Sequence, residues 1–327
     1  MKILITGGAG FIGSNLVDVL VKKKHQVIVI DNLITGRKKN LEKSYKKISF
    51  FKIDVAYLSK KHNKIFKNID CIFHLAGLAD IVPSITDPNK YFKANVIGTE
   101  RVLEFAKNNK VKKFIYAASA SCYGIPKNFP TSEKDIIDPR YPYALTKKIG
   151  EDLVLHWAQV YKMNNSSLRL FNVYGRRSRT TGAYGALFGV LLAQKIKNKP
   201  LTIVGDGNQT RDFIYIDDLI NGFVKAITKS KKGEVYNLAS GKETKINKIA
   251  KLIGGKKVFI PKRPGEPTRS LANITKARKH FNWKPNVTIE KGVNKLLNNI
   301  NDWKNAPLWT EKKISYATKE WFKFLKK

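Results

Sequence analysis

Cysteine, acidic residues and long apolar runs are all scarce in this chain of 327 residues. Its two cysteines, Cys71 and Cys122, are too few and too far apart for a disulfide framework or a zinc cluster. No stretch of the sequence approaches the roughly 20 consecutive apolar residues that a membrane-spanning helix needs. Met1 and Lys2 run directly into a strand-like segment, so no secretory leader is expected. We therefore expect a cytoplasmic protein with no membrane partner and no metal site.

The shortage of acidic residues leaves a large positive charge. Lys and Arg together number 62 against 25 Asp and Glu, which gives a formal net charge of +37. Such a charge is typical of proteins that bind nucleic acid or anionic membranes. Only 11 of the 62 basic residues are arginines, however, and the 51 lysines are scattered along the chain instead of forming one stripe. A solvated lysine-rich surface explains the charge better than a nucleic-acid interface, although its field would still attract a phosphate-bearing small molecule.

The chain does contain a regular alternation of strand-like and helix-like segments up to Val173. Apolar runs such as KILIT, QVIVID and KFIYAAS alternate with segments whose apolar residues have helical spacing. This alternation predicts βαβ units, and therefore a parallel sheet with helices on both faces. We predict an α/β fold: a Rossmann-type doubly wound parallel sheet in residues 1–173, joined by segments near 211–240, and a smaller α/β substrate-binding lobe in residues 174–327.

The first strand-to-helix turn, ITGGAGFIGS, is a candidate phosphate-binding loop that includes Gly7 and Gly13. Glycines here allow backbone N–H groups to approach a pyrophosphate and allow the helix to pack closely on the strand. Asp31 lies 18 residues past Gly13, where a carboxylate can accept hydrogen bonds from the adenosine ribose and would repel a 2′-phosphate. NAD is therefore predicted over NADP. Asp54 and Val55 end the next strand-like run, and Asp54 is either an adenine ligand or an ordinary loop carboxylate.

A tyrosine and a lysine four residues apart, in the segment YPYALTK, are the candidate catalytic pair. Tyr143 and Lys147 would share one face of a helix whose first turn holds Pro142. A nearby ammonium group favours the phenolate, so Tyr143 could accept a proton from a sugar hydroxyl. The spacing by itself is weak evidence in a lysine-rich chain. It gains weight from YAASASCYG, which ends a strand that the sheet would place near the same crevice.

In these motifs the chain resembles the extended short-chain dehydrogenase/reductase family that acts on nucleotide sugars. The segments TGGAGFIGS, FHLAG, SASCYG, YPYALTK, RLFNVYG, GDGNQTRDFIYIDDL and RPGEPTRSLANITKARKHFNWKP follow the family's order over nearly the whole chain. The resemblance implies that Ser119 orients the reacting oxygen of the substrate and that Tyr143 is the acid/base. It also implies that Lys147 binds the nicotinamide ribose and lowers the pKa of Tyr143, which leaves Tyr141 as a flanking residue at the lip of the site.

The resemblance extends to the cofactor and to the nucleotide end of the substrate. Arg211 and Arg263 match two arginines that clamp a diphosphate, for which guanidinium forks suit the oxygens better than ammonium groups. Asn172 matches a residue that bonds the diphosphate region, and Glu266 one that bonds the uridine ribose. Ser270 matches a position that limits room around the sugar, and its small size would admit an N-acetylated hexose. The implied cofactor-binding residues are Gly7, Gly10, Phe11, Ile12, Gly13, Asp31, Asn32, Asp54, Val55, Leu75, Ala76, Gly77, Tyr143 and Lys147. The implied substrate-binding residues are Ser119, Ser121, Asn172, Arg211, Arg263, Glu266 and Ser270.

The residues that follow Ser119 bear on the reaction. Family members share a first step in which hydride passes from the sugar to NAD and leaves a 4-keto sugar. Dehydratases resembling this chain carry Asp-Glu after the catalytic hydroxyl residue and decarboxylases usually carry a glutamate, whereas this chain has Ala120 and Ser121. The pattern is most like the 4-epimerases of UDP-hexoses, so NAD-dependent inversion at C4 is predicted, with a homodimer implied by the resemblance. A nucleotide-sugar decarboxylase or dehydratase is the alternative within the family, and a nucleic-acid-binding protein on a Rossmann scaffold is the alternative from another class.

Several residues depart from the family's commonest pattern. The segment FHLAGLADIVPS carries Gly77 and Asp80 near the expected nicotinamide and sugar, and Asn273 stands where relatives usually have aspartate. The loop GRRSRTTGAYG is unusually basic. Its arginines, within Arg176–Arg179, either recognise an acidic sugar such as a uronate or belong to a solvated basic loop.

Overall fold

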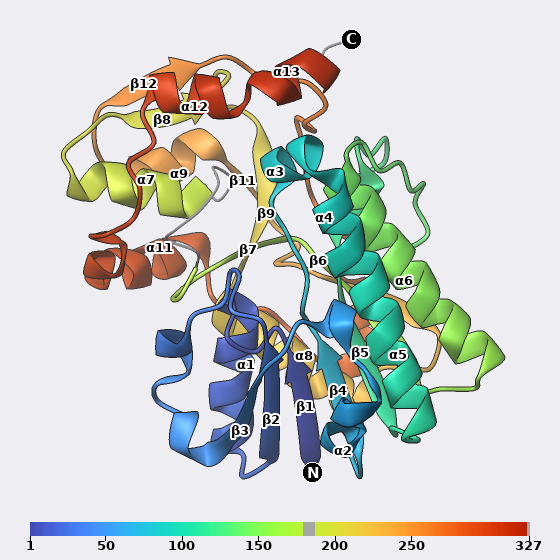
Figure 1. Ribbon diagram of the computed structural model, residues 1–327. Helices are drawn as coiled ribbons and strands as arrows, with labels where there is room; N and C mark the ends of the chain where they lie inside the picture. Colours follow the sequence, from blue (N-terminus) through green and yellow to red (C-terminus); the bar gives the residue numbers. More distant parts are fainter. Residues whose placement is uncertain (179–186, 326–327) are drawn as a thin grey trace.

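The computed structural model describes residues 1–178 and 187–325, which form a larger lobe around a parallel sheet and a smaller lobe above it (Figure 1). The strands of the large sheet are β1 (Lys2–Thr6), β2 (Gln26–Asp31), β3 (Ile48–Lys52), β4 (Cys71–His74), β5 (Lys113–Ser119), β6 (Asn165–Leu170) and β10 (Glu234–Leu238). Within the described residues this sheet has seven strands in the order β10-β6-β5-β4-β1-β2-β3, and every neighbouring pair is parallel. The predicted Rossmann-type doubly wound sheet is therefore confirmed.

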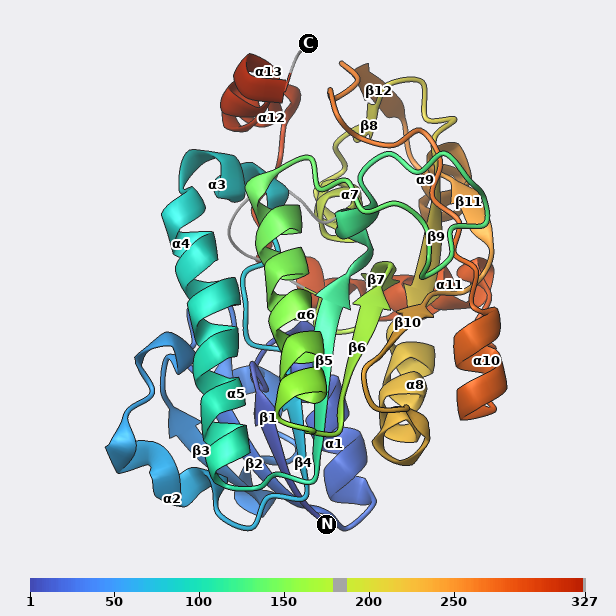
Figure 2. The same cartoon turned by 90° about the vertical axis from the view of Figure 1, so that its right-hand side faces the viewer.

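Helices cover both faces of the large sheet (Figure 2). One face carries α1 (Phe11–Lys22), α8 (Ile216–Lys229) and α10 (Thr275–Phe281), and the other carries α5 (Gly98–Asn108) and α6 (Pro142–Val160). Strand β1 is buried on both sides, because Ile3 and Ile5 pack into the core beneath α1 while Leu4 packs into the core beneath α5 and α6. A strand buried on both faces reads as a continuous apolar run, which is why KILIT could be identified from sequence.

Shorter helices join the strands along the open edges of this lobe. They are α2 (Asn63–Phe66), α3 (Ile81–Thr86), α4 (Pro88–Phe92), the π-helix η5 (Lys93–Ile97), and the 3₁₀ helices η1 (Lys38–Leu41), η2 (Tyr45–Lys47), η3 (Val55–Tyr57), η4 (Lys60–His62) and η6 (Ala120–Tyr123), whereas the 3₁₀ helix η7 (Ile300–Trp303) belongs to the smaller lobe. Two of them matter for the site. Helix η6 follows β5 directly, so it continues from Ser119, and α3 packs against α6 beside the catalytic motif.

The smaller lobe lies beyond the carboxyl ends of β1, β4 and β5 (Figure 1). Its strands are β7 (Asn172–Tyr174), β8 (Leu201–Val204), β9 (Thr210–Tyr215), β11 (Glu243–Lys245) and β12 (Lys257–Ile260). Its helices are α7 (Leu187–Ile196), α9 (Ile246–Ile253), α11 (Ile289–Asn298), α12 (Glu311–Ala317) and α13 (Lys319–Leu325). Strand β9 pairs with both β7 and β11, and β8 pairs with β12.

The chain passes between the two lobes more than once. Strand β9 belongs to the smaller lobe and runs straight into α8, which packs on α1 in the larger lobe. Strand β10 then joins the edge of the large sheet beside β6. The division at residue 173 remains a prediction.

No helix in residues 1–178 and 187–325 is long and apolar enough to span a membrane.

Candidate active site

The glycine loop between β1 and α1 is closed so tightly that side chains would not fit. Gly7 has a φ of 70°, and a Cβ atom there would lie 2.6 Å from the backbone nitrogen of Ala76. A Cβ atom on Gly13 would lie 2.2 Å from the carbonyl oxygen of Gly7. Helix α1 then begins at Phe11 without a side-chain cap on Gly10. The first N–H groups of a 12-residue helix are therefore directed to the crevice, as a pyrophosphate site requires.

Asp31, at the end of β2, is tied to this loop. One carboxylate oxygen accepts the N–H of Ala9 at 2.9 Å and the other accepts the N–H of Leu33 at 2.8 Å. The side chain is buried, and burial raises its pKa while these two hydrogen bonds lower it. Each oxygen keeps capacity for a further hydrogen bond, so the carboxylate can still receive ribose hydroxyls. Sequence reasoning predicted a ribose ligand here and missed that Asp31 also shapes the glycine loop.

A cavity of about 470 Å³ extends from Asp31 and Asp54 to Tyr143 and Lys147. Every residue predicted to bind the cofactor lines it: Gly7, Gly10, Phe11, Ile12, Gly13, Asp31, Asn32, Asp54, Val55, Leu75, Ala76, Gly77, Tyr143 and Lys147. Asp54 accepts the N–H of Ala56 at 2.9 Å and the amide of Asn32 at 3.1 Å, so it also caps η3. The glycine loop, the acidic strand end and the buried lysine together fit a dinucleotide.

A second cavity, of about 420 Å³, lies between the lobes and meets the first at Ser119 and Tyr143. It is lined by the whole predicted substrate-binding set: Ser119, Ser121, Asn172, Arg211, Arg263, Glu266 and Ser270. Tyr141 lines it too. A substrate in the second cavity would thus reach Tyr143 from one side while a cofactor in the first reached it from the other.

The end of β5 and the start of α6 bring three hydroxyl groups to this junction. The Ser119 Oγ and Ser121 Oγ atoms are 2.8 Å apart, and the backbone N–H of Ser121 donates to Ser119 Oγ at 3.2 Å. Burial raises the pKa of Tyr143, its hydrogen bonds with Ser119 and Ser121 lower it, and the negative charge of Asp80 raises it. These contacts hold the phenol beside hydroxyl groups that can orient an incoming sugar oxygen.

Lys147 lies one helical turn after Tyr143 and is only 7% exposed. Burial lowers the pKa of Lys147 to about 7, against a smaller raising effect of Glu151. Its Nζ atom lies 4.2 Å from the centroid of the Tyr116 ring, a favourable cation–π distance. The family resemblance implied that Lys147 lowers the pKa of Tyr143. Burial is instead the largest effect on the pKa of Tyr143, and it raises that pKa.

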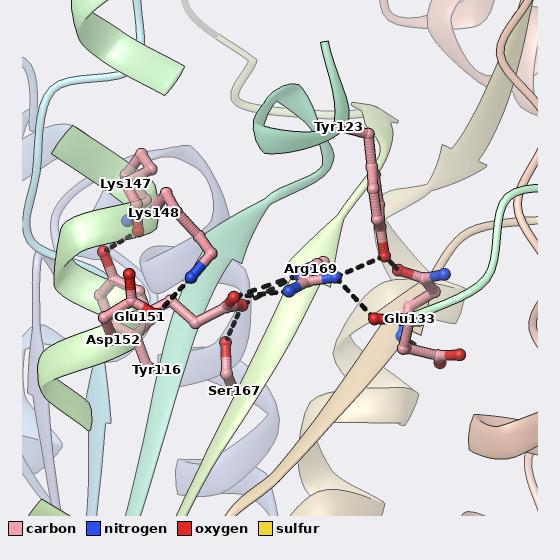
Figure 3. A network of polar contacts seen from close by, with 10 residues as sticks. Tyr116, Tyr123, Glu133, Lys147, Lys148, Glu151, Asp152, Ser167 and Arg169 are labelled. Carbon is pink, nitrogen blue, oxygen red and sulfur yellow. Dashed lines mark hydrogen bonds and ion pairs between the residues drawn. The ribbon is translucent and has the colours of Figure 1, made fainter. Parts of the chain in front are cut away.

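A buried ion pair anchors the catalytic helix to the sheet (Figure 3). Glu151, one turn beyond Lys147, accepts hydrogen bonds from Arg169 on β6, with an Nη2–Oε1 distance of 2.7 Å. Ser167 donates to the same carboxylate at 2.8 Å. Arg169 also donates to the Tyr123 hydroxyl at 2.8 Å, and Tyr123 lies on η6, just after Ser119. The network therefore connects the helix of Tyr143 with the segment of Ser119.

Aromatic rings surround the phenol of Tyr143. The Tyr141 ring stacks on it with an interplanar angle of 10° and a centroid distance of 6.4 Å, and the Tyr91 ring meets it edge-on at 6.4 Å. Trp321, from the distant helix α13, contacts Tyr141 at 6.3 Å. Sequence reasoning missed Tyr91 and Trp321, for which no motif gave a signal. Tyr141 belongs to the catalytic motif, but the motif did not predict that its ring stacks on Tyr143, because the stacking depends on the turn before α6.

At the far end of the second cavity, Glu266 lies between two arginines. Arg263 Nη1 is 2.9 Å and Arg211 Nη2 is 3.6 Å from its carboxylate oxygens. Both guanidinium groups are largely buried, with 11% and 14% of the side chains exposed. Two buried cations around one carboxylate leave net positive charge, which suits a diphosphate.

In the described part of the basic loop, Ser178 lines the second cavity but the two arginine side chains are paired elsewhere. Arg176 pairs with Asp217, and Arg177 pairs with Asp18 at 2.7 Å. Arg177 lines the first cavity, and neither arginine lines the second. Arg179 lies outside the described residues. Their pairing supports a structural role for Arg176 and Arg177 over recognition of a uronate.

Asn273 is a residue at which the sequence departs from the family's commonest pattern. Asn273 lies outside both cavities, where its side chain accepts the N–H of Thr275 at 3.0 Å at the start of α10. The side chain at this departure from the family pattern therefore does not line the site. In the part of the chain that the structure describes, no group of three His, Cys, Asp or Glu side chains is placed to hold a metal ion.

Known proteins share both the sequence pattern and the fold. Residues 3–239 match the model of the NAD dependent epimerase/dehydratase family. A putative UDP-glucose 4-epimerase of Methanocaldococcus jannaschii is 33% identical over 90% of this chain and 97% of its own length. A crystal structure of Thermotoga maritima UDP-glucose 4-epimerase with UDP-glucose is similar with a TM-score of 0.87 and 32% identity, covering 92% of this chain and 99% of that one. A Bacillus cereus UDP-glucuronic acid 4-epimerase, solved with UDP-glucuronic acid and NAD, gives a TM-score of 0.85 and 34% identity with the same coverage. The chain therefore belongs to the NAD dependent epimerase/dehydratase family.

Proposed function

We propose that this protein is an NAD-dependent epimerase that inverts C4 of a UDP-hexose through a transient 4-keto sugar. The observation that carries the proposal is the junction of the two cavities at Ser119 and Tyr143. The first cavity has the glycine loop and acidic strand end of a dinucleotide site, and the second has the paired arginines of a diphosphate site. The sequence relative and the two solved structures described above are named as UDP-sugar 4-epimerases, one of them as putative, which supports the same proposal.

In this proposal each residue at the junction has one task. The glycine loop and Asp31 would hold NAD in the first cavity, where the cofactor would supply the hydride chemistry at C4 of the sugar. Tyr143 takes the proton of the C4 hydroxyl and gives it back after the keto sugar has turned. Ser119 and Ser121 hold the reacting oxygen with their paired hydroxyl groups. Lys147 holds the cofactor ribose and, when protonated, favours the phenolate of Tyr143.

The nucleotide end of the substrate is assigned to the smaller lobe. Arg211 and Arg263 bind the diphosphate, and Asn172 on β7 supports them from the edge of the cavity. Glu266, which lies between the two arginines, accepts hydroxyls of the uridine ribose. These contacts hold the nucleotide and not the hexose, so the hexose can rotate beside Tyr143, as inversion at C4 requires.

The small side chains around the hexose leave its identity open among three substrates. Ser270 and Ser121 line the second cavity, which favours room for a substituent such as an N-acetyl group. The alternative reactions, decarboxylation and dehydration, are disfavoured because Ala120 and Ser121 replace the carboxylates that family members use for them. UDP-glucose, UDP-N-acetylglucosamine and UDP-glucuronate are therefore the substrates to compare.

The test is product analysis with these three UDP-sugars, each incubated with the purified protein and NAD. NMR of the products should reveal the C4 epimer of at least one sugar, without release of carbon dioxide. Carbon dioxide from UDP-glucuronate would identify a decarboxylase, and loss of water would identify a dehydratase. If no UDP-sugar is converted, the proposed function is wrong. Conversion of UDP-glucose without any of UDP-N-acetylglucosamine would refute the argument from the size of Ser270.

We further propose a cytoplasmic homodimer whose partner is the nucleotide sugar and not nucleic acid. Helix α6 and the neighbouring α4 carry the exposed apolar residues Phe92, Leu145 and Val160, which a second copy could cover. The free and buried Cys71 and Cys122 suit a reducing compartment. Light scattering after size exclusion tests the dimer. Binding to DNA that weakens steeply with salt and survives Tyr143→Phe would support the nucleic-acid alternative instead.

A further inference from the structure

Helix α13, near the C-terminus, brings a buried tryptophan to the nucleotide end of the second cavity. Trp321 is only 1% exposed, and its indole N–H donates to the carbonyl oxygen of Pro264 at 2.7 Å. The guanidinium carbon of Arg263 lies 5.5 Å from the centroid of the indole ring. The same ring contacts Tyr141 at 6.3 Å. One side chain thus touches the loop that carries Arg263 and the tyrosine that stacks on Tyr143.

The helix is held in this position from two sides. It packs against α3, beside the catalytic helix, at the upper end of the molecule (Figure 1). The preceding helix α12 buries Ile314 against Val190 of α7 and Ile260 of β12. These contacts link α13 both to the large lobe and to the strand that leads into the Arg263 loop. Trp321 is therefore fixed relative to both walls of the second cavity.

The loop that Trp321 contacts needs such an anchor. It contains Pro264 and Pro267, neither of which has a backbone N–H to donate. Gly265, between Pro264 and Glu266, has a φ of 72°, and a Cβ atom there would meet Leu325 of α13 at 3.9 Å. Because the loop carries Arg263 of the proposed diphosphate site and Glu266 of the proposed ribose site, any freedom of its backbone would move both charges.

We propose that Trp321 is a positioning residue for nucleotide-sugar binding, which fixes Arg263 and Glu266 against the second cavity. The inference rests on the proposed function, since it takes a nucleoside diphosphate as the ligand of that cavity. Helix α13 lies outside residues 3–239, the part of the chain that matches the family model. Trp321 contacts the Arg263 loop, which holds the nucleotide, and Tyr141, which does not transfer the proton, so its effect should appear in binding and not in the chemical step.

The experiment compares Trp321→Leu with Phe324→Leu, a control on the same helix whose side chain is 61% exposed. Trp321→Leu should raise the Kd for UDP, measured by calorimetry, about tenfold, as expected from loss of a largely buried cation–π contact and its anchoring hydrogen bond. KM for the UDP-sugar should rise with it, while kcat and the Kd for NAD stay within about twofold. Phe324→Leu should leave all four values unchanged.

Two further variants separate positioning from general damage. Trp321→Phe keeps an aromatic ring near Arg263 but loses the N–H that bonds Pro264, so UDP affinity should fall by about threefold. In an Arg263→Ala background, Trp321→Leu should cost clearly less than tenfold, because one of the two residues through which it acts is gone. An equal tenfold cost in both backgrounds, or wild-type UDP affinity in Trp321→Leu, would overturn the proposal. A wild-type protein that bound no UDP would instead contradict the proposed function, and the proposal with it.

Discussion

The buried ammonium group of Lys147, which belongs to the catalytic site, should destabilise the fold. Lys147 is 7% exposed, and burial lowers its pKa from an ordinary 10.5 to about 7. Lys147→Met removes the charge and keeps an unbranched side chain of similar length. We expect this variant to be more stable than the wild-type protein and to have lost turnover, because the charge serves the reaction at the expense of the fold.

The size of the effect follows from the pKa. A fall of about 3.5 units corresponds to at most about 5 kcal/mol at about 1.4 kcal/mol per unit. The cation–π contact with Tyr116, at 4.2 Å, is lost in the variant and offsets about 1 kcal/mol. Structural relaxation and water entry reduce the penalty further in real proteins. We therefore expect Lys147→Met to increase the free energy of unfolding by about 2 kcal/mol at pH 7.

The stability difference between Lys147→Met and the wild-type protein should depend on pH. Unfolded Lys147 keeps its proton up to about pH 10.5, whereas folded Lys147 loses it above about pH 7. The unfolded state binds more protons between these values, so wild-type stability rises with pH relative to a variant without the lysine. The advantage of Lys147→Met should be complete below pH 7 and should shrink steadily toward pH 10.

Urea unfolding from pH 6.5 to 9.5, with protein freed of bound nucleotide, measures this difference. Other titrating groups cancel when the variant is subtracted from the wild type. Lys251→Met, which removes an exposed lysine on α9, is the matched control and should show no comparable trend. A difference that stays constant across the pH range, or a Met variant less stable than wild type at pH 7, would show that the buried charge of Lys147 does not destabilise the fold.

Two other predictions concern the residues around this lysine. Tyr143→Phe should reduce turnover at least a thousandfold and leave the Kd for NAD within about twofold, because only the hydroxyl that transfers the proton is lost. Steady-state rates and NAD titration measure these two quantities. Near-normal turnover would exclude Tyr143 as the acid/base. Glu151→Gln should lower the free energy of unfolding by about 3 kcal/mol, since it leaves the buried Arg169 guanidinium uncompensated, whereas Asp152→Asn, at the exposed pair with Lys148, should cost under about 1 kcal/mol. Equal costs in urea unfolding would contradict the buried role of Glu151.

Sequence alone predicted the parts of the fold that local patterns determine. The central strands of the large sheet could be predicted because they are buried on both faces and so form apolar runs, as β1 and β5 show, whereas the edge strand β3 is largely exposed. The glycine loop and the spacing of Tyr143 and Lys147 are local as well. Their assembly around one junction followed from the rule that ligands bind at the carboxyl ends of parallel strands.

Contacts between distant segments could not be predicted in this way. Trp321 lies 58 residues after Arg263 in the chain, and no periodicity links the two. Asp212 is a further example: its carboxylate accepts backbone N–H groups of Ser240, Gly241 and Ala272, so it organises loops that no motif connects. The pKa of Tyr143 depends in the same way on burial, which the sequence does not contain. Such features depend on packing between the lobes.

Hydride transfer at C4 and proton loss from C4 would leave different isotope patterns in the product. UDP-glucose carrying deuterium at C4, or the corresponding UDP-sugar that the protein converts best, is incubated with the protein and NAD in ordinary water. If the hydride leaves C4 and returns to the opposite face, NMR and mass spectrometry will show the epimer with its deuterium still at C4. Loss of that deuterium to water would mean that C4 gives up a proton instead, and would contradict the mechanism at Tyr143.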